Sequence, residues 1–229
     1  MEFRTEHKGV AVSYYPGCNR VAVVYASGLP QYPSGYHPFV RTLCDLGYHL
    51  FVPKYPGSWE TSGVFGVANS VMAVQAAVEL ARTGRCIETY NNERVTWTVS
   101  KIIVVGFSYG ALPALMSVAD AHVVICPFTN VLLHQKGDLE QTLAFIRRAY
   151  KHVYRIDNEA FLKELDEVIL PETVRPLTVV IGAKDSVVSP EEVSWLLHRY
   201  PDARIKVSEV AHTPNLAEID WREVLEENI

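Results

Sequence analysis

A serine in the pentapeptide 106–110, Gly-Phe-Ser-Tyr-Gly, is a candidate nucleophile. The pentapeptide follows the apolar run 101–105 and precedes a helical pattern that begins at Ala111. At such a strand-to-helix junction, Gly-x-Ser-x-Gly forms a strained turn that holds the serine hydroxyl clear of the sheet edge. Glycines flank the turn where strand and helix approach too closely for a Cβ atom. We therefore expect Ser108 to be a nucleophile; the alternative is a turn without chemistry.

A serine hydroxyl attacks a carbonyl carbon only when a base takes its proton, and His212 is the candidate base. His212 lies in the loop 209–214, between the strand-like run 204–207 and the last helical pattern. Active-site groups gather at the carboxyl ends of strands in an open α/β sheet. An ordinary solvated loop residue is the alternative. The remaining histidines lie in helical or cap segments, at strand starts or near the terminus: His7, His37, His49, His122, His134, His152 and His198.

Asp185 is the candidate for orienting the base, because a carboxylate fixes the imidazole tautomer and stabilises the imidazolium. It directly follows the apolar strand 177–181, in a loop that leads to a helix start at Ser189. An ordinary loop aspartate is the alternative. The order Ser108, Asp185, His212 along the chain, each at the end of an expected strand, favours a catalytic triad.

The elements that must position these residues alternate between short apolar runs and helical patterns. Most of the runs are continuously apolar rather than alternating, as in strands covered on both faces of a parallel sheet. The expected strands span 21–25, 49–52, 101–105, 122–126, 177–181 and 204–207, with 10–14 as an antiparallel edge strand. The sequence therefore predicts an α/β fold with an open, mostly parallel, doubly wound sheet. Its length of 229 residues suits one domain, 1–229.

Helices are expected between the strands. Valines at 67, 71, 74 and 78 recur at helical spacing, and Leu216, Ile219 and Val224 mark a short last helix. Ser189-Pro190, with Glu192 three residues after the serine, is a typical helix start.

The segment 127–176 contains two helical patterns and no expected strand. Leu139, Leu143 and Ile146 form the first, opened by Asp138, and the second holds Phe161, Leu165, Val168 and Ile169. We expect a helical cap over the site; plain helical filler is the alternative.

The chain resembles the α/β-hydrolase superfamily over nearly all of its length. Residues 106–110 resemble the family's nucleophile elbow, 182–185 its acid loop and 211–214 its histidine loop, and 127–176 stands where the family has its cap. The resemblance implies an esterase, lipase, thioesterase or peptidase that needs no cofactor.

Two backbone N–H groups are expected to hold the oxyanion of the reaction. The Tyr109 N–H lies at the start of the helix after the elbow, where free N–H groups favour an anion. Many family members carry His-Gly after the strand that resembles 21–25, but this chain has Ala-Ser-Gly-Leu-Pro at 26–30. Leu29 is the expected second donor by position, with Gly28 next. Ser27 is a rival serine, but no tight strand-to-helix turn follows it.

The expected reaction is hydrolysis of a small carboxylic ester through an acyl-enzyme on Ser108. A thioesterase, or an exopeptidase or acyl-peptide hydrolase, could use the same triad, and a hydrolase scaffold that binds a ligand without turnover is an alternative of another class. Tyr32, Tyr36, Trp59 and Phe128 are candidates to line an apolar pocket. Arg147 and Arg148 could meet an anionic substrate, although adjacent arginines usually form a solvated helix face.

Composition and charge limit the kinds of molecule that this protein is expected to bind. The net charge of −5 and the lack of a basic stripe argue against nucleic acid. The charged N-terminus and the strand-length apolar runs predict neither a secretory signal nor a membrane span. The cysteines lack the paired spacing of zinc or redox sites, and Cys126 reads as a buried, reduced thiol. We expect a cytoplasmic protein without metal that acts on a small-molecule acyl substrate.

Overall fold

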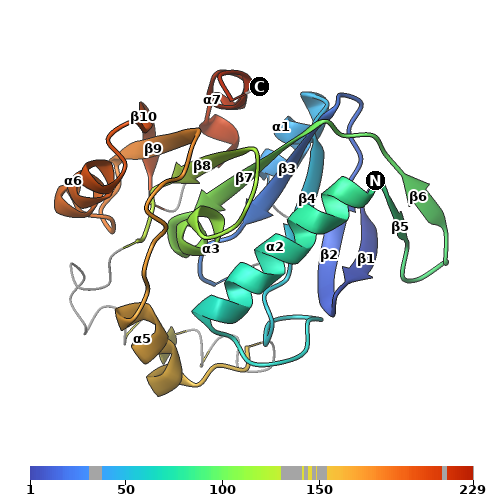
Figure 1. Cartoon of the computed structure of the whole chain (residues 1–229), viewed down its shortest axis with the longest axis horizontal. Helices are drawn as coiled ribbons and strands as arrows, with labels where there is room; N and C mark the ends of the chain where they lie inside the picture. The colour runs from blue at the N-terminus through green and yellow to red at the C-terminus, as the bar shows by residue number, and fades with distance from the viewer. Residues whose placement is uncertain are drawn as a thin grey trace.

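The computed structural model describes residues 1–30, 38–129, 141, 144, 145, 148, 154–212 and 216–228. Its main feature is an eight-stranded sheet with helices on both faces (Figure 1). The strands of this sheet are β1 (Phe3–His7), β2 (Val10–Tyr15), β3 (Val21–Ala26), β4 (His49–Pro53), β7 (Lys101–Phe107), β8 (Ala121–Ile125), β9 (Leu177–Lys184) and β10 (Arg204–Ala211). Their spatial order is β1-β2-β4-β3-β7-β8-β9-β10.

The strands expected from the continuously apolar runs are confirmed. Strands β4, β3, β7, β8, β9 and β10 pair in parallel, and every residue of β3, β4 and β8 is buried. Because helices cover both faces of β3, β4 and β8, these three strands carry mostly apolar side chains on both faces. The carboxyl ends of the parallel strands therefore meet at one edge of the sheet.

The antiparallel strand expected at 10–14 is present as β2, but the prediction that it forms the sheet edge is wrong. Residues 3–7 form β1, which pairs with β2 through a two-residue turn at Lys8 and Gly9. Both turn residues have positive φ, 52° and 77°, as a tight hairpin requires. The charged composition of 3–7 hides this strand, because an edge strand needs only one buried side chain, here Thr5, on its inner side.

Two layers of helices enclose the sheet (Figure 1). Helices α2 (Val67–Thr83), α3 (Ala111–Leu115), α5 (Asn158–Asp166) and α6 (Pro190–Arg199) contribute to the apolar core on one face. Helices α1 (Pro38–Asp45) and α7 (Trp221–Glu226) contribute to the core on the other. A small separate hairpin, β5 (Arg85–Ile87) and β6 (Arg94–Thr96), follows α2.

The helix start predicted at Ser189 is confirmed. The Ser189 side chain accepts a hydrogen bond from the Glu192 N–H at 3.2 Å, and Pro190 is the first residue of α6. The helical pattern at 216–224 becomes two pieces, a 3₁₀ turn (Leu216–Glu218) and α7. Asp220 caps α7 by accepting from the Glu223 N–H at 3.0 Å, which explains the break between them.

The cap prediction is only partly covered by the structure. The helical pattern at 138–146 falls largely outside the described residues. Helix α5 contains Phe161 and Leu165 of the second pattern and buries both, but it ends at Asp166, before Val168 and Ile169. The Glu164 carboxylate of α5 accepts from the Val67 and Ala68 N–H groups at 2.6 and 3.2 Å, so it caps the start of α2. This contact anchors the later part of the insertion to the core; that 127–176 acts as a cap stays a prediction.

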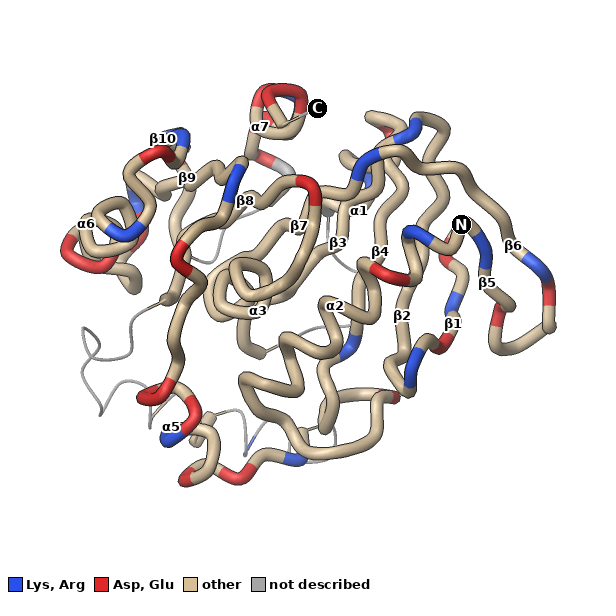
Figure 2. Tube along the Cα trace, in the orientation of Figure 1, with Lys and Arg blue, Asp and Glu red and all other residues tan. Residues whose placement is uncertain are grey.

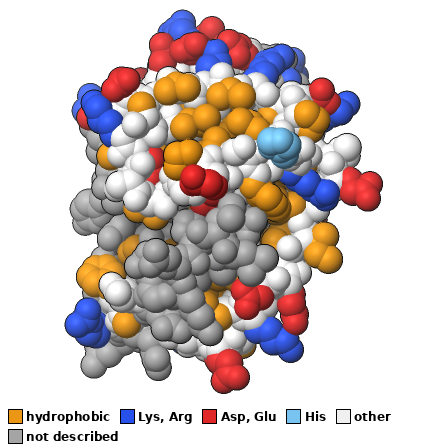
Figure 3. Space-filling view, turned by 90° about the vertical axis from the view of Figure 1, so that its left-hand side faces the viewer, with side chains coloured by type: hydrophobic (Ala, Val, Ile, Leu, Met, Phe, Trp, Pro, Cys, Tyr) orange, Lys and Arg blue, Asp and Glu red, His pale blue; other side chains and the backbone are white. Residues whose placement is uncertain are grey.

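Strand β10 forms an edge of the sheet and is largely exposed. Figure 3 views the molecule from the side of α6 and β10, where hydrophobic side chains gather between charged ones. Ile205 and Val207 are exposed on β10, and Lys206 between them pairs with Glu223 and Glu227. Such charges on an edge strand disfavour further strand pairing.

Lys and Arg are interspersed with Asp and Glu along the described trace (Figure 2). Within the described ranges, no helix combines the length and the apolar character needed to cross a membrane.

Candidate active site

The candidate nucleophile lies on a strained turn at the end of β7. Ser108 has a φ of 51°, in the left-handed region that non-glycine residues rarely adopt. A 3₁₀ turn (Ser108–Gly110) and the short helix α3 follow. Pro113 is the third residue of α3, where its missing N–H costs no helical hydrogen bond.

The two flanking glycines are required by close backbone contacts. A Cβ atom on Gly106 would lie 2.4 Å from the carbonyl oxygen of Gly110, and one on Gly110 would lie 2.0 Å from that of Ala26. Both distances are far inside van der Waals contact. The turn thus packs β7, α3 and the end of β3 together at this edge of the sheet.

Ser108 and His212 are joined by a hydrogen bond. The distance from Ser108 Oγ to His212 Nε2 is 2.9 Å, although 104 positions separate the residues in sequence. The His212 ring also packs beside the Phe107 ring, with centroids 5.7 Å apart. With Nδ1 carrying the ring proton, Nε2 can accept the serine proton, which is the arrangement a general base needs.

Asp185 completes the chain of hydrogen bonds. Its Oδ2 and Oδ1 atoms lie 3.0 and 3.1 Å from His212 Nδ1. Oδ1 also accepts from the backbone N–H groups of Val187 and Val188, at 2.8 and 3.0 Å. The side chain is only 4% exposed. The structure therefore brings together the three residues that the sequence singled out.

The surroundings of Asp185 keep it ionised. Burial by itself would raise the pKa of this carboxyl group. The hydrogen bonds from His212 and from two backbone N–H groups outweigh burial and lower the pKa to about 2. Asp185 is therefore a carboxylate at neutral pH and can hold the His212 Nδ1 proton in place.

Replacing Asp185 by asparagine should remove a pH-dependent part of the folding stability. The folded pKa of about 2 lies below the ordinary 3.8, so ionised Asp185 stabilises the fold above pH 4, and this contribution is lost as the pH falls to 2. It corresponds to about 2 kcal/mol. Denaturant unfolding at about pH 6 and about pH 2 should show wild type losing about 2 kcal/mol more than Asp185→Asn. Equal losses in both proteins would contradict the assignment.

The other described histidines have structural partners away from Ser108. His49 Nδ1 lies 2.8 Å from the Tyr14 hydroxyl. His122 Nε2 lies 3.1 Å from the Ser117 carbonyl oxygen, and His198 Nδ1 lies 2.9 Å from the Ser194 carbonyl oxygen. His7 lies 4.0 Å from Glu79. His37, His134 and His152 lie outside the described residues.

The loop after β3 lies directly against the candidate nucleophile. A Cβ atom on Gly28 would lie 3.2 Å from Ser108 Cβ and 3.1 Å from the Phe107 ring. This closeness fits backbone donors near Ser108, although the roles of the Leu29 and Tyr109 N–H groups stay predictions. The rival Ser27 is buried, and its carbonyl oxygen accepts from the Tyr55 hydroxyl at 2.8 Å.

The structure describes only some of the residues that were expected to line a pocket or meet an anionic substrate. Tyr32, Tyr36 and Arg147 lie outside the described residues. Phe128 is 8% exposed and packs into the core on the α2 face, so it contributes to ordinary core packing. Trp59 is half-buried and Arg148 is exposed.

Residues 126–129, called the strap below, form hydrogen bonds to both Ser108 and helix α6. The sequence gives no local signal for these contacts. The Phe128 N–H donates to the Ser108 carbonyl oxygen at 3.2 Å. The Thr129 N–H donates to Glu192 Oε1 at 2.5 Å, and Glu192 is fully buried in α6. Cys126, at the other end of the strap, is a buried free thiol, as expected. From the local sequence, a glutamate in the first turn of a helix is expected to be an exposed capping residue. Its contact with Thr129, 63 positions away, could therefore not be predicted from the sequence.

Glu192→Ala should destabilise the protein by roughly 1–3 kcal/mol, because it leaves the Thr129 N–H buried without a partner. Glu192→Gln keeps an acceptor oxygen and should restore most of the loss. Glu191→Ala, on the exposed neighbour in the same helical turn, is the control and should stay within about 0.5 kcal/mol of wild type. Urea unfolding measures all three; a Gln variant as unstable as the Ala variant would argue against this hydrogen bond.

Known proteins resemble this chain in their fold and not detectably in their sequence. No family model matches the chain, and no curated protein matches its sequence. An esterase from Pyrococcus furiosus superposes with a TM-score of 0.68 at 16% identity, covering 100% of this chain and 88% of the esterase. An α/β serine hydrolase without lid from Xanthomonas campestris gives 0.61 at 15% identity, covering 100% and 92%. A carboxylesterase structure from Nitrososphaera gargenis gives 0.63 at 13% identity, covering 98% and 95%.

The strand order, the turn at Ser108 and these superpositions agree. The chain has the α/β-hydrolase fold.

Proposed function

We propose that this protein is a serine hydrolase that cleaves a small carboxylic ester through an acyl-enzyme. The observation that carries the proposal is the unbroken chain of hydrogen bonds from Ser108 Oγ through the His212 ring to the Asp185 carboxylate, at 2.9 and 3.0 Å. A serine held at a φ of 51° beside a histidine is otherwise a costly arrangement without a structural use.

In the proposed mechanism, Ser108 Oγ attacks the ester carbonyl carbon while His212 Nε2 takes the hydroxyl proton. The tetrahedral oxyanion is held by the N–H groups of Tyr109 and Leu29. Collapse of this intermediate breaks the bond to the alcohol, which leaves with the proton returned by His212. A water molecule, deprotonated by His212, then releases the carboxylic acid and restores Ser108. Asp185 stays ionised throughout and stabilises the imidazolium.

An ester is the preferred substrate because two of the superposed proteins are named as esterases, and because no group that would grip a peptide terminus is identified among the described residues. The same triad could also act on a thioester or an acylated amine.

The decisive experiment is labelling with a fluorophosphonate probe, which phosphonylates an activated serine. Wild type should label and Ser108→Ala should not, while Ser27→Ala, a variant of the rival serine, should label like wild type. Labelling of Ser108→Ala at the wild-type rate would refute the proposal.

Substrate class is tested by comparing short p-nitrophenyl esters with aminoacyl-p-nitroanilides. Faster turnover of the esters supports an esterase, and faster turnover of the anilides supports an exopeptidase on the same triad. Labelling of Ser108 without turnover of either class would point to a ligand-binding protein.

A further inference from the structure

Lys54 carries a buried positive charge on the sheet, outside the catalytic machinery. It follows the last residue of β4, and its N–H donates to the Ala11 carbonyl oxygen at 2.8 Å, continuing the ladder between β4 and β2. Alternation along the paired strands places Lys54 on the face that also carries Ser13 of β2 and Arg4 of β1. Two cations and a hydroxyl from neighbouring strands thus share one face of the sheet.

The ammonium group of Lys54 lacks a partner. The residue is only 4% exposed, and Nζ forms no hydrogen bond and no ion pair within the described part of the chain. Lysine is almost never this buried unless it is paired, because an unpaired ammonium loses its hydration without compensation. A site that keeps such a group is suited to an anion that supplies the missing partner.

The surrounding charges do not neutralise Lys54 directly. Arg4 binds the nearby carboxylates, with Glu2 at 3.5 Å and Glu60 at 3.4 Å, and both pairs lie at the surface. Arg4 also donates to the Tyr90 hydroxyl at 3.1 Å. Arg4 thus engages Glu2 and Glu60, whereas the carboxylate of Glu6, an exposed residue on the same face of the sheet, takes part in neither pair.

A small cavity adjoins Lys54. It has a volume of about 120 Å³, and Arg4, Ser13, Lys54, Glu60 and Tyr90 are among the residues that line it. The Ser13 side chain is buried, with 3% of the residue exposed. The cavity therefore offers the unpartnered Lys54 ammonium group and the Ser13 hydroxyl as donors, beside the carboxylates of Glu6 and Glu60, in a volume that suits a small oxyanion.

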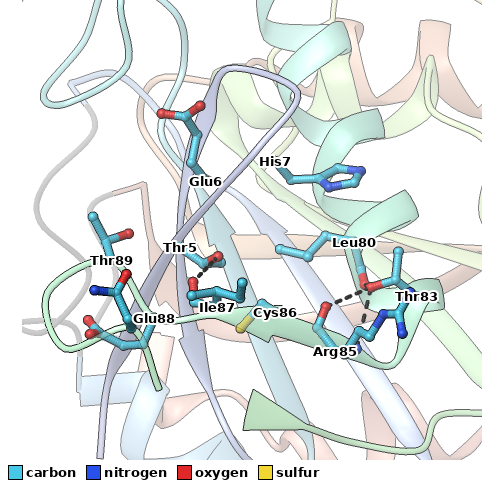
Figure 4. Close-up of a pocket in the computed structure, with 11 residues that line it drawn as sticks. Thr5, Glu6, His7, Leu80, Thr83, Arg85, Cys86, Ile87, Glu88 and Thr89 are labelled. Atoms are coloured by element: carbon cyan, nitrogen blue, oxygen red, sulfur yellow. Dashed lines mark hydrogen bonds between the residues drawn. The ribbon is translucent and has the colours of Figure 1, made fainter. Parts of the chain in front are cut away.

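A larger neighbouring cavity shows the contrast. About 730 Å³ of space lies between β1, the end of α2 and β5 (Figure 4). There the Thr5 hydroxyl donates to the Ile87 carbonyl oxygen at 2.8 Å. The Thr83 hydroxyl donates to the Arg85 carbonyl oxygen at 2.9 Å. No buried side-chain atom that lines it lacks a partner among the described residues. Its polar groups bind one another, so it gives no indication of a ligand.

The charge state of Lys54 fits a need for an anion. Burial lowers the pKa of its ammonium group to about 8, and Glu60 and Glu2 partly oppose this effect. With that pKa the side chain is still mainly protonated at neutral pH.

We propose that the cavity at Lys54 binds a small oxyanion, a phosphate or a short carboxylate, through the Lys54 ammonium group and the Ser13 hydroxyl. This site is separate from the Ser108 machinery, and its occupancy does not depend on the proposed hydrolase activity. Its volume excludes large phosphorylated ligands from full burial.

The test measures thermal unfolding and isothermal titration with inorganic phosphate and, in a separate arm, with acetate, at constant ionic strength set by NaCl. For a dissociation constant near 1 mM, about 20 mM phosphate should raise the Tm of wild type by roughly 4–7 °C. Lys54→Met keeps the side-chain length without the charge and should show no rise. It should also unfold at a higher temperature than wild type in anion-free buffer, because it removes an unpaired buried charge. Lys8→Met, on an exposed lysine beside β1, should respond like wild type.

Two outcomes would overturn the proposal: no saturable binding of either anion to wild type, or an equal response of Lys54→Met. A response to phosphate but not to acetate assigns the site to phosphate, and the reverse assigns it to carboxylates. If Lys54→Met does not fold, Ser13→Ala is the second variant and should weaken phosphate binding at least threefold; unchanged binding would count against the site.

Discussion

His212→Ala should lower kcat by roughly 10⁴-fold or more while the protein stays folded. Without the imidazole, Ser108 Oγ loses its hydrogen-bonded proton acceptor, and Asp185, which contacts Nδ1 of the same ring, no longer has a base to orient. The measurement is steady-state hydrolysis of a short p-nitrophenyl ester, with far-UV circular dichroism to verify folding.

The matched control is His198→Ala, which removes an exposed histidine of α6 whose ring binds only its own helix. Its kcat should stay within about twofold of wild type. A loss of less than about tenfold in His212→Ala would mean that another group acts as the base.

Gly110→Ala should destabilise the protein by roughly 3 kcal/mol or more and abolish labelling of Ser108. The added Cβ atom would lie 2.0 Å from the Ala26 carbonyl oxygen, so β3 and the elbow must move apart. The backbone conformation itself is not the problem, because Gly110 has an ordinary helical φ of −61°. Urea unfolding gives the stability, and fluorophosphonate labelling reports the geometry of the turn.

Gly9→Ala is the control in which backbone strain, and not steric overlap of the added Cβ atom, opposes the substitution. Gly9 has a φ of 77°, but no atom lies within 4 Å of an added Cβ. Its substitution should cost only the backbone strain, roughly 1–2 kcal/mol, and should leave labelling of Ser108 unchanged. If Gly110→Ala were no worse than Gly9→Ala, close packing would not be the reason for glycine in the elbow.

Much of the fold could be predicted because its signals are local. The apolar runs of the central strands, the Ser189 cap of α6 and the glycines at 106 and 110 each express a backbone preference or a burial pattern within a few residues. The triad followed from the same logic, since strand ends in a parallel sheet converge at one edge. The edge strand β1 was missed because a single buried side chain leaves no pattern.

By itself, the sequence determined the central strands, the helices α2 and α6 and the three side chains that reach the same edge, because these depend on short-range periodicity and chain order. Only the tertiary structure decided the contacts between residues far apart in sequence. Glu164 caps the start of α2, Glu192 accepts from the Thr129 N–H, and the Lys54 ammonium group finds no hydrogen-bond partner within the described part of the chain. The physical reason is that the hydrogen bonds and hydration of such groups depend on packing, and packing is settled only when the whole sheet and its two helical layers close together.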